Sequence, residues 1–143
     1  MKNSITLIAL VLFIASCNVK PQEIYFGEDT CHYCSMTIVD KQHASQLVTE
    51  KGKVYKFDAI ECMVDHLSED TTPIALYLVT DYTHPEELID AKKATFIISA
   101  NIPSPMKANL SALASKSKAE ELQESKGGEL YTWETLLAHL NKE

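Results

Sequence analysis

The sequence predicts an α+β fold of two small ββαβ units, each a β-hairpin followed by a helix and a further strand. Its 143 residues are 45% hydrophobic and 23% charged, a composition typical of one compact domain or two small subdomains. Strand-like and helix-like segments are mixed locally, which favours α+β over a doubly wound sheet. We expect the first unit over residues 26–83 and the second over residues 84–143.

The first unit is expected to open with a hairpin that leads into a helix. The β-rich runs 43–50 and 53–59 flank Lys51-Gly52, a short hairpin signal. Asp58 stands where a helix N-cap would, and Glu61 follows three residues later as in a capping box. A helix should therefore begin directly after the second strand.

Apolar patterns predict the rest of the first unit. Four residues have the i, i+3, i+4, i+7 spacing of one buried helical face, namely Ile60, Met63, Val64 and Leu67. Pro73 ends this stretch, and residues 74–80 are a nearly continuous apolar run of strand length. Such a run predicts a central strand.

The second unit has the same order of elements. Strands are expected at residues 94–99, 110–114 and 129–131. Residues 117–126 are helix-prone, and Gly127-Gly128 supplies a stop. Thr132 can cap a final helix whose apolar side is formed by Trp133, Leu136, Leu137 and Leu140.

The N-terminus has the pattern of an export signal. Lys2 precedes an apolar run over residues 5–15 that is too short to cross a bilayer as a helix. The run ends in Ile14-Ala-Ser-Cys17, which resembles the lipobox of bacterial lipoproteins. We expect a signal peptide over residues 1–16, lipidation of Cys17 and a lipidated tether over residues 17–25; the alternative is a plain secretory signal. Export would place the domain in an extracytoplasmic, disulfide-permissive compartment.

The charge balance argues against nucleic acid as a partner. The net charge is −7, and all 13 basic side chains counted as lysine or arginine are lysines. Phosphate binding depends on clustered lysine and arginine, and this acidic chain has no arginine.

A cysteine pair with a nearby methionine is the strongest candidate metal site. Cys31-x-x-Cys34 alone also suits dithiol redox sites and structural zinc. Met36 lies two residues past Cys34, so both side chains would point to one face of an extended segment. A thiolate and a thioether together suit Cu(I). Met36 as an ordinary core-filling side chain is the simpler alternative.

A structural zinc site is the main competing interpretation. Cys62 and His66 are one helical turn apart and, with Cys31 and Cys34, complete a zinc-like set. The simpler roles are a buried small hydrophobe for Cys62 and a solvated helix end for His66. His32, between the paired cysteines, can assist a metal or only occupy a turn.

A thiol oxidoreductase is the weaker, enzymatic alternative. It needs Cys-x-x-Cys at the start of a helix, whose dipole lowers the thiol pKa. The β-branched residues 37–39 that follow the pair favour an extended segment instead. We therefore expect that the protein is not an enzyme.

Several motifs together resemble the NosL family, lipoprotein copper chaperones of nitrous oxide reductase maturation. The matching segments are the lipobox at Cys17, Asp29-Thr-Cys31-His-Tyr-Cys34-Ser-Met36, Phe57-Asp58 running into Cys62-Met63, Thr80-Asp81-Tyr82, Ile89-Asp90-Ala91, Ser104-Pro105-Met106, and Gly127-Gly128 before Tyr131 and Trp133. The resemblance implies two ββαβ units similar in topology to organomercurial lyase. This sequence departs from the family pattern at Ser35 and Lys107, where the family usually has glycine.

The resemblance also implies a function and a ligand set. Met106 becomes a ligand candidate beside Cys31, Cys34 and Met36, with weaker support for His32, Cys62 and His66. The cargo is expected to be Cu(I), and the expected partners are nitrous oxide reductase and its membrane maturation complex. Cys17 would attach the protein to a bacterial membrane, on the periplasmic side.

Overall fold

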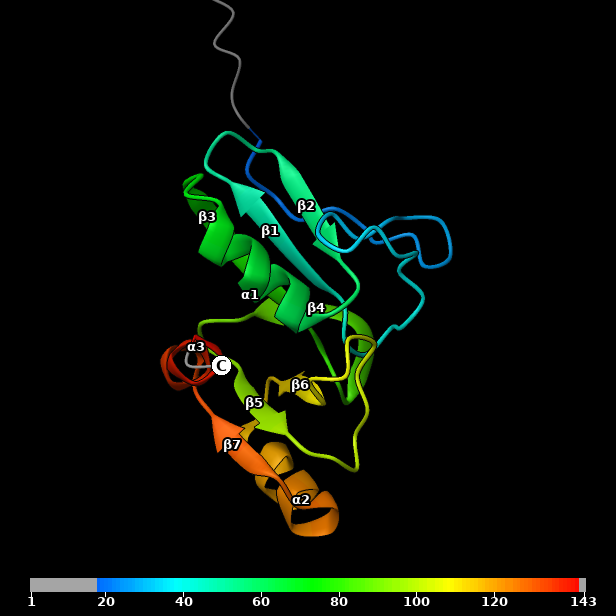
Figure 1. Cartoon of the computed structure of the whole chain (residues 1–143), viewed down its shortest axis with the longest axis vertical. Coiled ribbons are helices and arrows are strands. Elements are labelled where there is room, and N and C mark those ends of the chain that lie inside the picture. The colour runs from blue at the N-terminus through cyan, green and yellow to red at the C-terminus, as the bar shows by residue number, and fades with distance from the viewer. Residues whose placement is uncertain (1–17, 142–143) are drawn as a thin grey trace, which may run out of the picture.

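The computed structural model describes residues 18–141 and consists of two antiparallel sheets with three helices (Figure 1). The expected signal peptide and Cys17 lie outside the described residues. Within the described part, no helix is both long and apolar enough to cross a membrane. The predicted α+β class is confirmed.

The first sheet has four strands in the order β2-β1-β3-β4. β1 (Ser45–Thr49) and β2 (Val54–Phe57) form the predicted hairpin. β3 (Ile74–Asp81) lies between β1 and β4, as expected for a central strand. β4 (His84–Asp90), which pairs with β3, was not predicted as a strand. Residues 84–90, expected at the start of the second unit, thus extend the sheet of the first.

The helix after the hairpin, α1 (Ile60–Glu69), begins without the predicted capping box. Its N-cap is Ala59, and no side chain caps the helix. The expectation for Asp58 and Glu61 was therefore wrong. Both carboxylates make contacts outside the helix instead, with Cys34 and with Ser104.

The second sheet has three strands in the order β6-β5-β7. Its elements follow the predicted order, β5 (Thr95–Ile98), β6 (Leu110–Leu113), α2 (Lys116–Lys126) and β7 (Glu129–Tyr131). Gly127 is the C-cap of α2 as predicted, and Ser115 caps its start. Thr132 caps α3 (Trp133–Leu140), where it forms a capping box with Thr135.

Both units contribute to one hydrophobic core. Phe57 and Met63 from the first unit and Phe96 and Leu136 from the second belong to the same buried cluster. Trp133 joins the sheets, since its ring lies 5.9 Å from the rings of both Tyr77 and Phe96. α1 contacts strands of both sheets, β1, β2 and β6.

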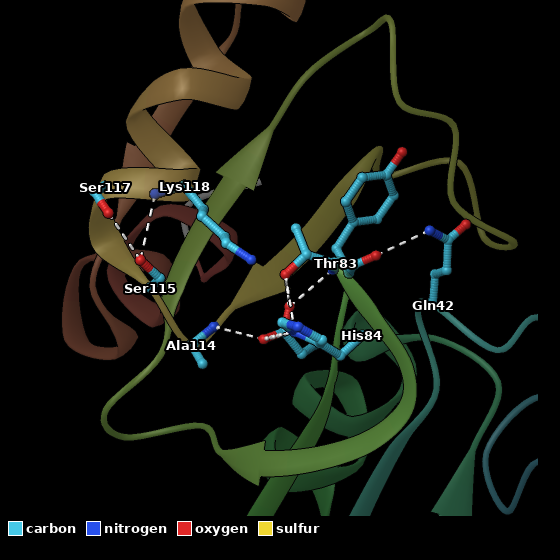
Figure 2. A network of polar contacts seen from close by, with 9 residues as sticks. Gln42, Thr83, His84, Ala114, Ser115, Ser117 and Lys118 are labelled. Carbon is cyan, nitrogen blue, oxygen red and sulfur yellow. Dashed lines mark hydrogen bonds and ion pairs between the residues drawn. The ribbon is translucent and has the colours of Figure 1, made fainter.

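A polar network also joins the two sheets (Figure 2). Asp81 ends β3, and one of its carboxylate oxygens accepts hydrogen bonds from the backbone and hydroxyl of Thr83. The other accepts from the backbone N–H of Ala114 at 3.3 Å, directly after β6, and lies 3.3 Å from His84. Asp81 is only 2% exposed, so the connection lies inside the protein.

Candidate metal centre

A tight turn carries Cys31 and Cys34. The backbone N–H of Cys31 donates to Met36 at 2.8 Å, and that of Ser35 donates back to Cys31 at 3.0 Å. Ser35 has a φ of 65°, which allows the chain to reverse. His32 donates its backbone N–H to Lys56 at 2.8 Å, fixing the turn against β2. The residues after the turn are not helical, as the β-branched run predicted.

The turn meets the start of α1 and forms a cluster of three thiols and one carboxylate. The ligand atoms of Cys31, Cys34, Asp58 and Cys62 all lie within 4.8 Å of one another. We call these four residues the Cys3Asp group. All but Cys34, which is partly exposed, are buried, and all three cysteines are free thiols. The Cys34 thiol donates to Asp58 Oδ1 at 3.4 Å.

The thiols of the group affect one another's protonation. A hydrogen bond from Cys62 lowers the pKa of Cys31 to about 6, assisted by the backbone N–H groups of Cys34 and Asp58 and opposed by burial. Burial, followed by Cys31 and Asp58, raises the pKa of Cys34 to about 11. The hydrogen bond to Cys31, and then burial, raises the pKa of Cys62. Of the three thiols, that of Cys31 is therefore the most readily ionised, and metal binding should release protons from the other thiols of the group.

The donor set fits a metal ion. Among residues 18–141, Asp58 Oδ2 is buried without a hydrogen-bond partner, so one carboxylate oxygen stays free for another contact. A buried unpaired carboxylate oxygen is costly and calls for an explanation. Three sulfurs suit Cu(I), while three sulfurs with one oxygen also suit tetrahedral zinc.

The two methionines proposed as ligands are exposed. Met36 is 51% exposed and Met106 is 38% exposed. Such exposure is unusual for methionine, which is mostly a core residue. Their role as ligands stays a prediction.

A buried carboxylate holds the loop of Met106 beside the group. Glu61 Oε1 accepts from the Ser104 hydroxyl at 2.7 Å and from the backbone N–H of Ala108 at 3.2 Å. Glu61 directly precedes Cys62 in α1, so the loop of the second unit lies against the same helical turn as the Cys3Asp group. Lys107, which replaces the family's glycine, has a φ of 70°.

The two candidate histidines lie together outside the group. The rings of His32 and His66 are 5.2 Å apart, and both contact Tyr55 and Phe57. His66 Nε2 is 3.6 Å from Asp70, too far for a hydrogen bond, and is buried without one. Burial, and then His66, lower the pKa of His32, which keeps its ring neutral at pH 7. The structure thus brings together the three cysteines of the predicted zinc site but not His66. Asp58 takes the place of the fourth candidate ligand.

Sequence reasoning missed Asp58 because it was interpreted as a helix cap. The missed signal is its spacing of four residues before Cys62, which places two ligand-type side chains around the start of one helix. Asp58 and Cys62 become part of a candidate metal site only because the Cys31–Cys34 turn packs against them. Cys34 in that turn contacts Asp58, from which it is 24 residues away in sequence.

Comparisons with known proteins agree on family and fold. The sequence profile of the NosL family matches residues 24–140. Among solved structures, the copper chaperone NosL from Shewanella denitrificans superposes with a TM-score of 0.71 at 24% identity, over 81% of this chain and 94% of that one. No curated protein sequence matches. Because the family profile covers most of the chain, including the Cys3Asp group and the Met106 loop, the protein belongs to the NosL family.

Proposed function

We propose that this protein is a membrane-anchored, extracytoplasmic Cu(I) chaperone that delivers copper for the assembly of nitrous oxide reductase. The observation that carries the proposal is the gathering of three free thiols and one carboxylate within 4.8 Å. Family membership and the likeness to a structure described as a copper chaperone support it. The role is that of a metal carrier and not of an enzyme.

The softness of the donors favours Cu(I) as the cargo. Thiolates and thioethers select Cu(I) over the hard cations Mg²⁺ and Ca²⁺. We propose Cys31, Cys34 and Met36 as ligands from the first unit and Met106 from the second. Asp58 and Cys62 complete the surroundings of the proposed ion, and His32 is a further candidate ligand.

The exposure of part of the site suits release. Cys34 is partly exposed and Met36 and Met106 are exposed, whereas Cys31 and Cys62 are 2% and 0% exposed. An incoming ligand from the acceptor can therefore approach from the methionine side while the buried thiols still hold the ion. Ligands of the chaperone would then be replaced one at a time by ligands of the acceptor, so that copper is not released into solution.

The lipobox supports a membrane location for this transfer. A lipid on Cys17 would confine the chaperone to the surface on which the maturation complex of nitrous oxide reductase is assembled. Confinement raises the effective concentration of donor and acceptor without any new contact.

Anaerobic Cu(I) titration against a chromophoric competitor tests the site. We expect Cys34→Ser and Met106→Leu to weaken Cu(I) binding by at least about tenfold, the lower end of the losses seen even for outer-shell changes. Met63→Leu is the matched control, because Met63 is a fully buried core residue. Equal affinity of Cys34→Ser, Met106→Leu and the wild type would refute the ligand assignment.

Structural zinc is the second candidate, since three thiols and a carboxylate also fit a tetrahedral zinc site. Metal analysis of protein purified without added metal separates the two. A zinc-containing protein that unfolds when a chelator is added would replace the chaperone proposal.

A further inference from the structure

Three of the four members of the Cys3Asp group are closed off from solvent. Cys31, Asp58 and Cys62 are 2%, 1% and 0% exposed, whereas Cys34 is partly exposed. A metal ion that enters or leaves the group therefore passes Cys34. Because Cys34 lies at the end of the Cys31–Cys34 turn, access to the buried donors depends on how firmly the turn is held against α1.

The turn is held on two sides. Toward β2, the backbone N–H of His32 donates to Lys56 O at 2.8 Å, and the centre of the His32 ring lies 4.4 Å from that of Tyr55. Toward α1, the Tyr33 hydroxyl donates to Glu69 Oε1 at 2.8 Å. The two residues between the paired cysteines are thus attached to β2 and to the end of α1, respectively.

The contact with α1 lies on the same helical face as a member of the Cys3Asp group. Cys62, Asp65 and Glu69 follow one another at i, i+3 and i+7 in α1, the spacing of one helical face. Seven residues of helix rise by about 10 Å. Tyr33 therefore joins the cysteine turn to the far end of the helical face that begins at the metal centre.

The two attachments of the turn differ in their exposure to solvent. Tyr33 is 38% exposed and Glu69 is exposed, so water competes for both partners of their hydrogen bond. Tyr55, against which the His32 ring packs, is buried. The attachment to α1 can therefore open while the attachment to β2 stays formed.

The hydrogen bond between Cys34 and Asp58 cannot take over this function in the loaded protein. The Cys34 thiol donates to Asp58 Oδ1 across 3.4 Å. A thiol loses its proton when it binds a metal ion, and this hydrogen bond is then lost. The Tyr33–Glu69 hydrogen bond involves no donor atom of the group and is compatible with a bound ion.

We propose that the Tyr33–Glu69 hydrogen bond is a latch that sets the rate at which copper enters and leaves the Cys3Asp group. The proposal rests on the Cu(I) chaperone role proposed above. Tyr33 is a positioning residue, since it holds the turn and offers no soft donor itself. When the latch opens, the Cys34 end of the turn moves away from α1 while His32 stays attached to β2, and ligands of the acceptor reach the buried thiols.

The latch predicts a change in rates without a change in affinity. A hydrogen bond that involves none of the metal-binding atoms contributes alike to the loaded and the unloaded protein. Its removal should therefore speed loading and release by the same factor. That factor is about fivefold, the shift in an equilibrium that one net hydrogen bond produces.

Anaerobic stopped-flow exchange of Cu(I) with a chromophoric competitor measures both rates. Tyr33→Phe keeps the ring but removes the donor, and it should raise loading and release about fivefold while the affinity changes by less than about twofold. Glu69→Ala should have the same effect, and the double variant should be no faster than either single variant. Glu69→Gln keeps an acceptor oxygen without the charge and should stay close to the wild-type rates.

The second sheet supplies a matched control. The Tyr131 hydroxyl donates to Glu129 Oε2 at 2.6 Å in an exposed pair of the same kind on β7. Tyr131→Phe should therefore leave both rates at their wild-type values. Urea unfolding of each variant shows whether it is folded.

The outcomes separate the latch from the proposed function. Wild-type rates for Tyr33→Phe in a protein that binds Cu(I) would overturn the latch alone, and lower stability with those rates would assign the contact to the fold. Weaker binding of Cu(I) without faster loading would also overturn it, since the contact would then stabilise only the loaded state. A wild-type protein that binds no Cu(I) would overturn the proposed function, and the latch with it.

Discussion

Ser35 occupies a backbone conformation that suits glycine. Its φ of 65° closes the turn between Cys31 and Met36. Non-glycine residues pay a steric penalty in this region, because their Cβ approaches the following carbonyl. The structure shows that the position needs a positive φ.

Ser35→Gly is therefore expected to stabilise the metal-free protein by about 0.5–1 kcal/mol, the relief of strain less the extra chain entropy of glycine. Urea unfolding under reducing conditions measures the difference. Ser125→Gly, at an exposed position in α2, is the matched control and should destabilise by about 0.5 kcal/mol. A Ser35→Gly protein no more stable than wild type would show that the turn is not strained.

Ser104 connects a loop to a helix through one buried hydroxyl. It donates to Glu61 and accepts from the backbone of Asn109, so it fixes both the loop and the carboxylate. Ser104→Ala should lower the free energy of unfolding by about 1–3 kcal/mol, because the buried Glu61 carboxylate loses its shortest hydrogen bond.

The same Ser104→Ala variant tests whether the loop positions Met106. If Met106 binds copper, Cu(I) affinity should fall together with stability. The competitor titration measures the affinity, with exposed Ser125→Ala as control. A Ser104→Ala protein that is destabilised but binds Cu(I) normally would separate the loop from the metal centre.

At the scale of elements, Asp81 connects the end of β3 with the end of β6. Burial alone would raise its pKa, but hydrogen bonds from Thr83 and Ala114 and the nearby His84 outweigh burial and lower the pKa below the usual 3.8. The folded protein therefore favours the ionised carboxylate more strongly than the unfolded chain does.

Asp81→Asn should be less stable than wild type at pH 7 by about 1–3 kcal/mol. Because the folded-state pKa is lowered, this contribution is present above about pH 4 and is lost as the pH falls through the folded-state pKa. The difference between wild type and Asp81→Asn should therefore shrink below pH 4. Urea unfolding at pH 7 and pH 3 measures it, and a difference that stays constant with pH would contradict the assignment.

At the scale of the whole molecule, one core joins the two units independently of any metal. Phe57, Met63, Phe96 and Leu136 are all fully buried in it. The two sheets are also connected by Trp133, by Asp81 and by α1. Such a protein should stay folded without its cargo, unlike a small zinc domain that depends on metal for its fold.

Removal of metal by a chelator should leave the circular dichroism spectrum unchanged. Cu(I) at 1,000 times its dissociation constant should stabilise the reduced protein by about 4 kcal/mol, because ligand binds only the folded state. Thermal unfolding with and without Cu(I) measures this shift. The shift should be much smaller for Cys34→Ser, and loss of secondary structure on chelation would favour structural zinc.

Local sequence patterns were enough to predict most of the elements, whereas Cys34 was expected in an extended segment and lies in a tight turn. The hairpin around Gly52, the cap at Thr132 and the stop at Gly127 depend on residues close in sequence, so spacing and residue type were enough to predict them. The prediction for Asp58 failed because it relied on the same local patterns. A single carboxylate before a helix is more often a helix cap than a member of a metal group.

The contacts of the polar residues around the Cys31–Cys34 turn depend on segments that are distant in the sequence. Asp58 meets Cys34 across 24 residues and Glu61 meets Ser104 across 43, contacts that no local pattern encodes. β4 extends the first sheet by pairing with β3, although residues 84–90 have no strong strand signal of their own. The candidate metal centre was thus visible in the sequence as a cysteine pair, and packing between distant segments made it a group of three thiols and a carboxylate.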